Sequence, residues 1–141
     1  MTRIIEMLRR HESVETHAYQ CPAGKTTIGV GRNIQKDSGL GLSEEEIDFL
    51  LSNDIIRCIK ELKKEYRWFG DLDEVRSAAI VDMFFCLGST RFRKFLKMIA
   101  ALEIADYSKA STEMLDSKFA KQTKGRALEL SEMLKTGMYY G

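Results

Sequence analysis

The sequence predicts a mainly helical α+β protein, in which a small antiparallel sheet near the amino terminus is followed by helices. Three observations support this fold class. Residues 17 to 34 are rich in Thr, Ile and Val and are interrupted by glycines, which is typical of a tight hairpin. A helical apolar period holds from Ser43 to about Tyr66. The whole chain contains a single proline and many Leu, Ile, Met, Glu and Lys residues, a composition that favours helix.

The first element is an amphipathic helix that we expect to end near Glu12. Its apolar residues Ile4, Ile5 and Leu8 fall three to four positions apart, as they do on one face of a helix. A carboxyl group at the end of a helix faces the negative pole of the helix dipole, which favours the protonated acid. A general acid catalyst needs that protonated form.

The predicted hairpin carries two further reactive groups, the thiol of Cys21 and the hydroxyl of Thr27. Pro22 and the glycines at positions 24, 29 and 31 allow tight turns and close backbone approach. Together with Glu12 at the preceding helix end, these groups could face one another across a cleft. Residues 35 to 42, QKDSGLGL, then form a polar connection.

The remaining two thirds of the chain are predicted to be helical. Ser43 followed by Glu46 is a capping box that starts the helix from Ser43 to about Tyr66. An apolar helix follows, capped near Asp73 and stopped at Gly88, and it should be the buried central helix of the second half. Two more helices are outlined by apolar residues between positions 92 and 102 and by residues 107 to 115.

Composition limits the classes of function. The 141 residues suit one soluble globular domain, and 22 basic and 21 acidic residues give a formal charge of +1. This balance does not support nucleic-acid or membrane binding, and it offers little long-range attraction toward an anionic polymer. Three cysteines without CxxC spacing make a disulfide framework or a zinc site unexpected and favour a reducing compartment. Residues 1–13 lack the apolar core of a signal peptide, and no apolar run approaches the ~20 residues of a membrane span.

The spacing of Glu12, Cys21 and Thr27, with Tyr19 two residues before the cysteine and the ending TIGVG, resembles the catalytic signature of the phage lysozymes of the T-even type, glycoside hydrolase family 24. The middle position of that signature is aspartate or cysteine in the family. The resemblance continues in VRSAAI at 75–80 and in SKFAKQTKGRALELSEMLKTG at 117–137, so it covers essentially the whole chain. Phe119 replaces the family's tryptophan, and Cys86 replaces a frequent Asn or Gln.

The resemblance implies a single two-lobed domain over residues 1–141. The small lobe would comprise about residues 13–50 and the connecting helix about 44–66, with a helical lobe made of about 1–12 plus 67–141. It also implies an endolysin that cleaves β-1,4 bonds between N-acetylmuramic acid and N-acetylglucosamine in peptidoglycan. No metal or other cofactor, no nucleic acid and no stable membrane binding would be involved. The protein would be a monomer that stays in the host cytoplasm until a holin pore lets it reach the wall.

Site residues follow from the same resemblance. Glu12 would be the general acid, and Cys21 and Thr27 would position the attacking water of an inverting hydrolysis. Substrate contacts would come from four further residues: Asn33, Phe85, Gln122 and Arg126. Of these, Gln122 would line the cleft, and Arg126 would be the cation placed against Glu12.

Two alternatives belong to other classes of protein. The first is a thiol-dependent peptidoglycan amidase or peptidase, with Cys21 as nucleophile and His11 or His17 as base. The second is a wall-binding protein that keeps the fold but has lost catalysis. The thiol enzyme would lose all activity in Cys21→Ser, whereas the lysozyme would keep at least part of it. The binding protein would hold saccharide without cleaving it.

Overall fold

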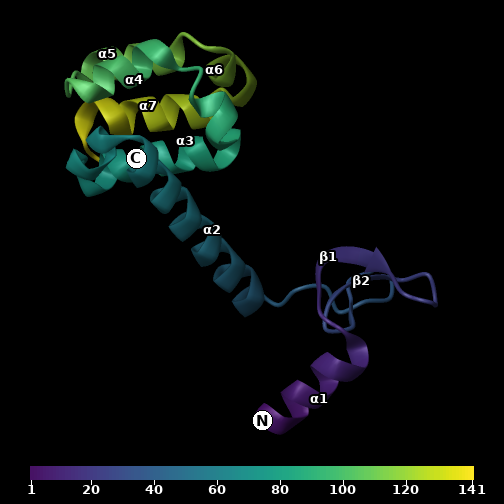
Figure 1. Cartoon of the computed structure of the whole chain (residues 1–141). Coiled ribbons are helices and arrows are strands. Elements are labelled where there is room, and N and C mark those ends of the chain that lie inside the picture. The colour runs from purple at the N-terminus through teal and green to yellow at the C-terminus, as the bar shows by residue number, and fades with distance from the viewer. The chain divides into compact units, whose positions relative to one another are not determined.

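The computed structural model describes all 141 residues and divides them into two compact units, Met1–Leu50 and Leu51–Gly141. Seven α-helices, one 3-10 helix and a three-stranded antiparallel sheet confirm the predicted α+β, mainly α class (Figure 1). The elements are α1 (Thr2–Glu12), β1 (Glu15–Gln20), β2 (Thr26–Gly29), β3 (Arg32–Asn33), α2 (Glu44–Glu65), η1 (Arg67–Asp71), α3 (Glu74–Phe92), α4 (Leu96–Glu103), α5 (Tyr107–Leu115), α6 (Lys118–Thr123) and α7 (Gly125–Thr136).

The first unit contains α1 and the whole sheet. Helix α1 ends at Glu12, as predicted, and Ser13 leaves the helix with a φ of 64°. The strands follow in the order β1–β2–β3, with both neighbouring pairs antiparallel. Thr27 pairs with Tyr19 on one side and with Asn33 on the other. The central strand β2 therefore carries Thr27 in the middle of the sheet.

The predicted capping box starts α2. The hydroxyl of Ser43 accepts a hydrogen bond from the Glu46 backbone N–H at 3.1 Å, and a Glu46 carboxylate oxygen accepts one from the Ser43 N–H at 2.9 Å. The same carboxylate oxygen pairs with Arg32 at 2.6 Å. Because Arg32 begins β3 and also donates to the carbonyl of Gly41 at 3.1 Å, the sheet is tied to the first turn of α2.

The second unit is built around α3, the predicted central helix. Asp73 caps its start, because its side chain accepts a hydrogen bond from the Arg76 N–H. Helix α7 packs against both α3 and α5, and Figure 1 shows it running between them. The core that these helices enclose includes Leu62, Trp68, Ile80, Met83, Phe92, Met98, Leu102, Met114, Phe119 and Leu134.

The sequence predicted that α3 ends at Gly88, but the helix continues to Phe92, and Gly88 only breaks its backbone. Its φ of 78° and ψ of 168° are not helical, and residues 89–92 add one further turn beyond the break. That turn brings Phe92 into the core, where it is fully buried against Phe84. Glycine suits the break because a residue with a Cβ is strained at this φ.

One element of the fold was not predicted, and one prediction stays open. The short helix η1 was not predicted; it forms around the buried aromatic residues Trp68 and Phe69. The expected packing of residues 1–12 with the helices of residues 67–141 stays a prediction. None of the helices is both long and apolar enough to cross a membrane.

Candidate active site

Glu12 lies against the turn that joins β2 to β3. A Cβ at Gly31 would stand 2.8 Å from the Oε2 atom of Glu12 and 3.2 Å from its carboxyl carbon. Gly31 also has a φ of +67°, a region that disfavours every residue with a side chain. The positive φ favours glycine here, and a side chain at this position would also displace the Glu12 carboxyl group.

The turn between β1 and β2 positions Cys21. The Gly24 N–H donates to the Cys21 carbonyl at 2.8 Å, and the Cys21 N–H donates to the Lys25 carbonyl at 2.9 Å. Pro22 and Gly24 occupy the second and fourth positions of this four-residue turn, where type I turns favour Pro and Gly. The sequence Cys-Pro-Ala-Gly thus closes the hairpin and fixes the backbone that carries the thiol.

Hydrogen bonds in the same turn stabilise the thiolate of Cys21. The backbone N–H of Lys25, followed by that of Ala23, lowers the pKa of the thiol below its ordinary value. Partial burial opposes this shift, while the Thr27 hydroxyl and the Gly24 N–H add to it. Cys21 is therefore more ionised near neutral pH than an ordinary cysteine, and a thiolate can accept a proton.

Thr27 stands beside this thiol and is almost completely buried, with 4% of its surface exposed. Its hydroxyl donates to the Lys25 carbonyl at 2.9 Å, and the same hydroxyl contributes to the lowered pKa of the Cys21 thiol. The hydroxyl has one proton, which serves one of these acceptors at a time. Since Cys21 is only half-buried, the thiol is the member of the pair that solvent reaches more easily.

Asn33 shares the face of the sheet on which Thr27 lies, because directly paired residues of neighbouring strands point the same way. Its side-chain oxygen already accepts a hydrogen bond from the Gln35 N–H at 2.9 Å. A Cβ at Gly39 would stand 2.7 Å from that oxygen, so the following loop packs closely over it. This leaves the amide NH₂ as the group of Asn33 that is available for a ligand.

In the second unit, Phe85 and Arg126 line one cavity of about 720 Å³. Phe85 is 44% exposed although the neighbouring residues Met83 and Phe84 are buried, so its ring is available for contact. The Nε atom of Arg126 donates to Asp82 at 2.6 Å. Asp82 was visible in the sequence as the one acidic residue between Ala78 and Leu87, but its pairing with Arg126 was not predicted.

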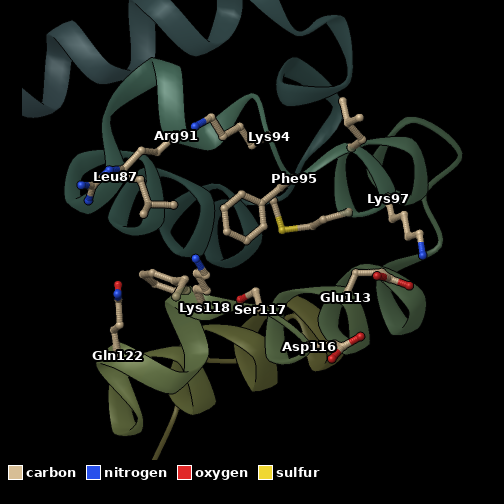
Figure 2. A pocket seen from close by; sticks show the side chains of 13 residues that line it. Leu87, Arg91, Lys94, Phe95, Lys97, Glu113, Asp116, Ser117, Lys118 and Gln122 are labelled. Carbon is tan, nitrogen blue, oxygen red and sulfur yellow. The ribbon is translucent and has the colours of Figure 1, made fainter.

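Gln122 lines a different cavity of about 690 Å³, shown in Figure 2. Phe95 lies near the middle of that view, and Gln122 lies toward one end. The predicted substrate residues of the second unit are thus divided between two cavities. In the first unit, Thr27 and Asn33 share one sheet, Cys21 lies in the turn between β1 and β2, and Glu12 contacts the turn between β2 and β3.

A histidine base for the thiol stays a prediction. Thr16 and the Nδ1 atom of His17 share a hydrogen bond of 2.9 Å, and no histidine is among the groups that shift the pKa of Cys21. The placement of Arg126 against Glu12 stays a prediction. Sequence reasoning missed Gly31 and Lys25 as parts of the site; the positive-φ glycine in TIGVG was the available signal for the first of these.

The mainly helical α+β fold, with a carboxyl group, a thiol and a hydroxyl in its first unit, agrees with a glycoside hydrolase of the lysozyme class. The model of the phage lysozyme family matches residues 9–132. The chain therefore belongs to the phage lysozyme family.

Individual relatives agree with this assignment. The chain is 28% identical over 129 residues to an endolysin of Acyrthosiphon pisum secondary endosymbiont phage 1, covering 92% of this chain and 86% of that protein. It is 23% identical over 158 residues to the probable T4-type lysozyme 2 of Dictyostelium discoideum, covering 94% and 93% of the two chains. It is also 27% identical to the pre-baseplate central spike protein Gp5 of Enterobacteria phage T4; the match covers 94% of this chain but only 27% of that longer protein.

Proposed function

We propose that the protein hydrolyses the β-1,4 bond between N-acetylmuramic acid and N-acetylglucosamine in bacterial peptidoglycan. The observation that supports this proposal is the lowered pKa of Cys21, to which Thr27 contributes, in the same unit in which Glu12 lies against Gly31. Hydrolysis of a glycosidic bond needs a proton donor for the leaving oxygen and a group that activates water. Glu12 can supply the first and the Cys21 thiolate the second.

In the proposed reaction, Glu12 gives its proton to the glycosidic oxygen as the bond to the anomeric carbon breaks. A water molecule attacks that carbon from the opposite face and loses a proton to the Cys21 thiolate. Thr27 donates its hydroxyl proton to the Lys25 carbonyl; in the proposed cycle it turns this proton toward the thiolate before the transfer and back to the carbonyl after it, since a hydroxyl has one proton to donate. The proton then passes from Cys21 through solvent back to Glu12, which restores the starting state.

Four residues would hold the sugar chain. Asn33 offers its amide NH₂, and Phe85 offers an exposed ring face against which the apolar side of a sugar can stack. Gln122 offers an exposed amide, and Arg126 offers the guanidinium nitrogens that Asp82 leaves free. The proposed partner is the peptidoglycan polysaccharide, bound by a monomer without a metal or other cofactor.

The proposed setting is the lysis of a host cell. The name endolysin of one relative supports a protein that accumulates in the host cytoplasm and reaches the wall through a holin pore. A test is expression in a bacterium with and without a co-expressed holin, followed by culture turbidity. Lysis that needs the holin supports this route, and lysis without it contradicts it.

The reaction is tested by incubating the protein with purified peptidoglycan and measuring new reducing ends. We expect muramic acid termini from the wild type and none from Glu12→Gln, a substitution that keeps the size of the side chain but removes the acid. Solubilised wall without reducing ends would contradict the proposal and indicate cleavage of peptide or amide bonds. Binding to the wall without any product would indicate a catalytically inactive protein.

Cys21→Ser separates the lysozyme from the thiol enzyme. A serine hydroxyl can still hold a water molecule beside Thr27, so part of the lysozyme activity should remain. A thiol amidase or peptidase would lose its nucleophile and all of its activity. The matched control is Cys58→Ser, which changes a half-buried cysteine of α2 that lines neither cavity and should leave the rate of reducing-end formation unchanged.

A further inference from the structure

The basic residues of this nearly neutral protein are unevenly distributed. Residues 51–141 contain 16 of the 22 basic and 13 of the 21 acidic residues, and residues 91–126 alone contain nine basic and four acidic ones. The formal charge of +1 therefore conceals a strongly basic segment. Local charge governs binding at short range because salt screens charges beyond about 8–10 Å.

Three of these basic residues converge on the cavity of about 690 Å³ from different elements. Arg91 lies in the turn after Gly88, Lys94 lies in the loop before α4, and Lys118 begins α6. All three are exposed. Figure 2 shows their side chains around one part of the cavity, and we call this set the basic end.

No carboxylate neutralises the basic end. Arg93 and Arg126, in the same segment, each pair with an acidic side chain, but Arg91, Lys94 and Lys118 form no ion pair. Holding three like charges around one cavity without a counterion is unfavourable, because each charge raises the local potential that the others meet. An anionic ligand would relieve this repulsion.

The other end of the cavity has different chemistry. Glu113 and Asp116 line it together with Lys97, and Figure 2 shows these three residues away from Arg91. The two carboxylates form no ion pair either. They would repel an anion that extended through the whole cavity. The basic end therefore suits a small, highly charged group such as phosphate, and the rest of the ligand must leave the cavity.

We propose that the basic end binds phosphate groups of a flexible, phosphate-bearing polymer of the bacterial wall. A chain can insert single phosphates into a concave site, whereas the surface of a bilayer cannot enter it. A nucleic-acid groove combines an extended basic track with several stacking aromatic rings. Here three basic residues converge on one cavity, in which Phe119 is buried and Phe95 is half-buried, so stacking rings are not freely exposed.

The inference rests on the proposed function only for the source of the polymer. Phosphate binding would hold the enzyme on a wall toward which the protein's net charge gives little attraction. Binding and bond cleavage are separable, because Glu12→Gln removes the acid and leaves the basic end unchanged. Polymer binding by Glu12→Gln with no reducing ends from the wild type would overturn the proposed function alone. Reducing ends without polymer binding would overturn this inference alone.

The test measures binding of fluorescein-labelled linear polyphosphate by fluorescence anisotropy over a series of salt concentrations. The test variant is Arg91→Gln/Lys94→Gln/Lys118→Gln. The matched control is Lys60→Gln/Lys64→Gln/Lys109→Gln, which removes the same charge from exposed positions that line neither cavity. We expect the test variant to bind at least ~10-fold more weakly and the control to bind like the wild type. The salt dependence of the test variant should also fall, by roughly 0.7–0.9 in log–log slope for each phosphate that the variant no longer neutralises.

A second variant tests the site by gain of binding. Glu113→Gln/Asp116→Gln removes the repelling carboxylates and should tighten polyphosphate binding severalfold, a result that misfolding could not produce. Equal losses in the test variant and the control would overturn the proposal, as would absence of polyphosphate binding by the wild type. Tighter binding to phosphatidylglycerol vesicles, or to single-stranded DNA, than to polyphosphate would also overturn it.

Discussion

The carboxyl group of Glu12 occupies the space beside Gly31 that a side chain would otherwise fill, with Oε2 2.8 Å from the position of a Cβ. The last residue of α1 therefore contacts the turn between β2 and β3. Arg32, the next residue after Gly31, is held by Glu46 and by the Gly41 carbonyl. The location of the proposed acid thus depends on how the sheet is attached to α2.

Gly31→Ala should lower kcat at least ~10-fold, because small displacements of a catalytic group carry large costs in rate. Gly29→Ala is a matched control: its φ of +69° is almost the same, but its Cβ would meet no atom within 4 Å. Both variants should lose about 1–2 kcal/mol of free energy of unfolding from the strained backbone. Reducing-end kinetics and thermal unfolding measure the two effects. Equal kcat values in the two variants would contradict a role of position 31 in placing Glu12.

Cys21 should react with iodoacetamide at lower pH than Cys58. Backbone N–H groups lower the pKa of Cys21, whereas burial raises that of Cys58. The thiolate reacts, so the midpoint of the rate against pH follows the pKa of each thiol. Mass spectrometry of the separate peptides after timed alkylation gives both midpoints in one sample. A midpoint for Cys21 at or above that of Cys58 would remove the case for a thiolate base.

Arg126→Gln should reduce activity on peptidoglycan with little change in stability. Its pair with Asp82 is about two fifths exposed on both sides, and such surface pairs contribute about 0–1 kcal/mol. The expected effect is a raised KM, because the proposed role of Arg126 is substrate binding. Arg93→Gln breaks the exposed pair with Glu65 and serves as the control. A loss of activity in both variants would point to general charge instead of a local contact.

Glu46→Gln should make the protein less stable at neutral pH but not in acid. Hydrogen bonds from Ser43, followed by the charge and donors of Arg32, lower the pKa of Glu46 below its ordinary value of 4.5. Because the pKa of Glu46 is lower in the folded state, the ionised carboxylate stabilises the fold above pH 4.5. This stabilisation is lost as the pH falls below that value. Denaturant unfolding followed by circular dichroism at several pH values measures the difference between variant and wild type.

Glu45→Gln is the control for that experiment. Glu45 also lies in the first turn of α2, and it forms no ion pair. Its substitution removes the same charge from the same end of the helix dipole. Any loss of stability that both variants share therefore comes from the dipole. A difference between the two variants that does not shrink in acid would contradict the role of the ionised Glu46 carboxylate.

Local sequence signals predicted most of the fold. The end of α1 at Glu12, the capping box at Ser43, the cap at Asp73 and the break at Gly88 were each visible as a specific residue type with a known backbone preference. Helix η1 was not predicted, because its buried aromatic residues become informative only once the core around them exists.

The site was predictable as a set of residues but not as a set of contacts. The spacing of Glu12, Cys21 and Thr27 pointed to their chemistry, while the competition of two acceptors for the Thr27 proton depends on coordinates. The pairing of Arg126 with Asp82 joins residues 44 positions apart, and no local pattern encodes it. The basic end was hidden in the sequence by a net charge close to zero.

The single tryptophan, Trp68, lies buried in the second unit, with its ring 5.0 Å from that of Tyr66. Residues 1–50 contain no tryptophan. Tryptophan fluorescence, excited at the long-wavelength edge of the absorption band, therefore reports on the larger unit alone. The unit that carries Glu12, Cys21 and Thr27 contributes no tryptophan fluorescence. An unfolding transition seen by circular dichroism but not by tryptophan fluorescence therefore belongs to the smaller unit.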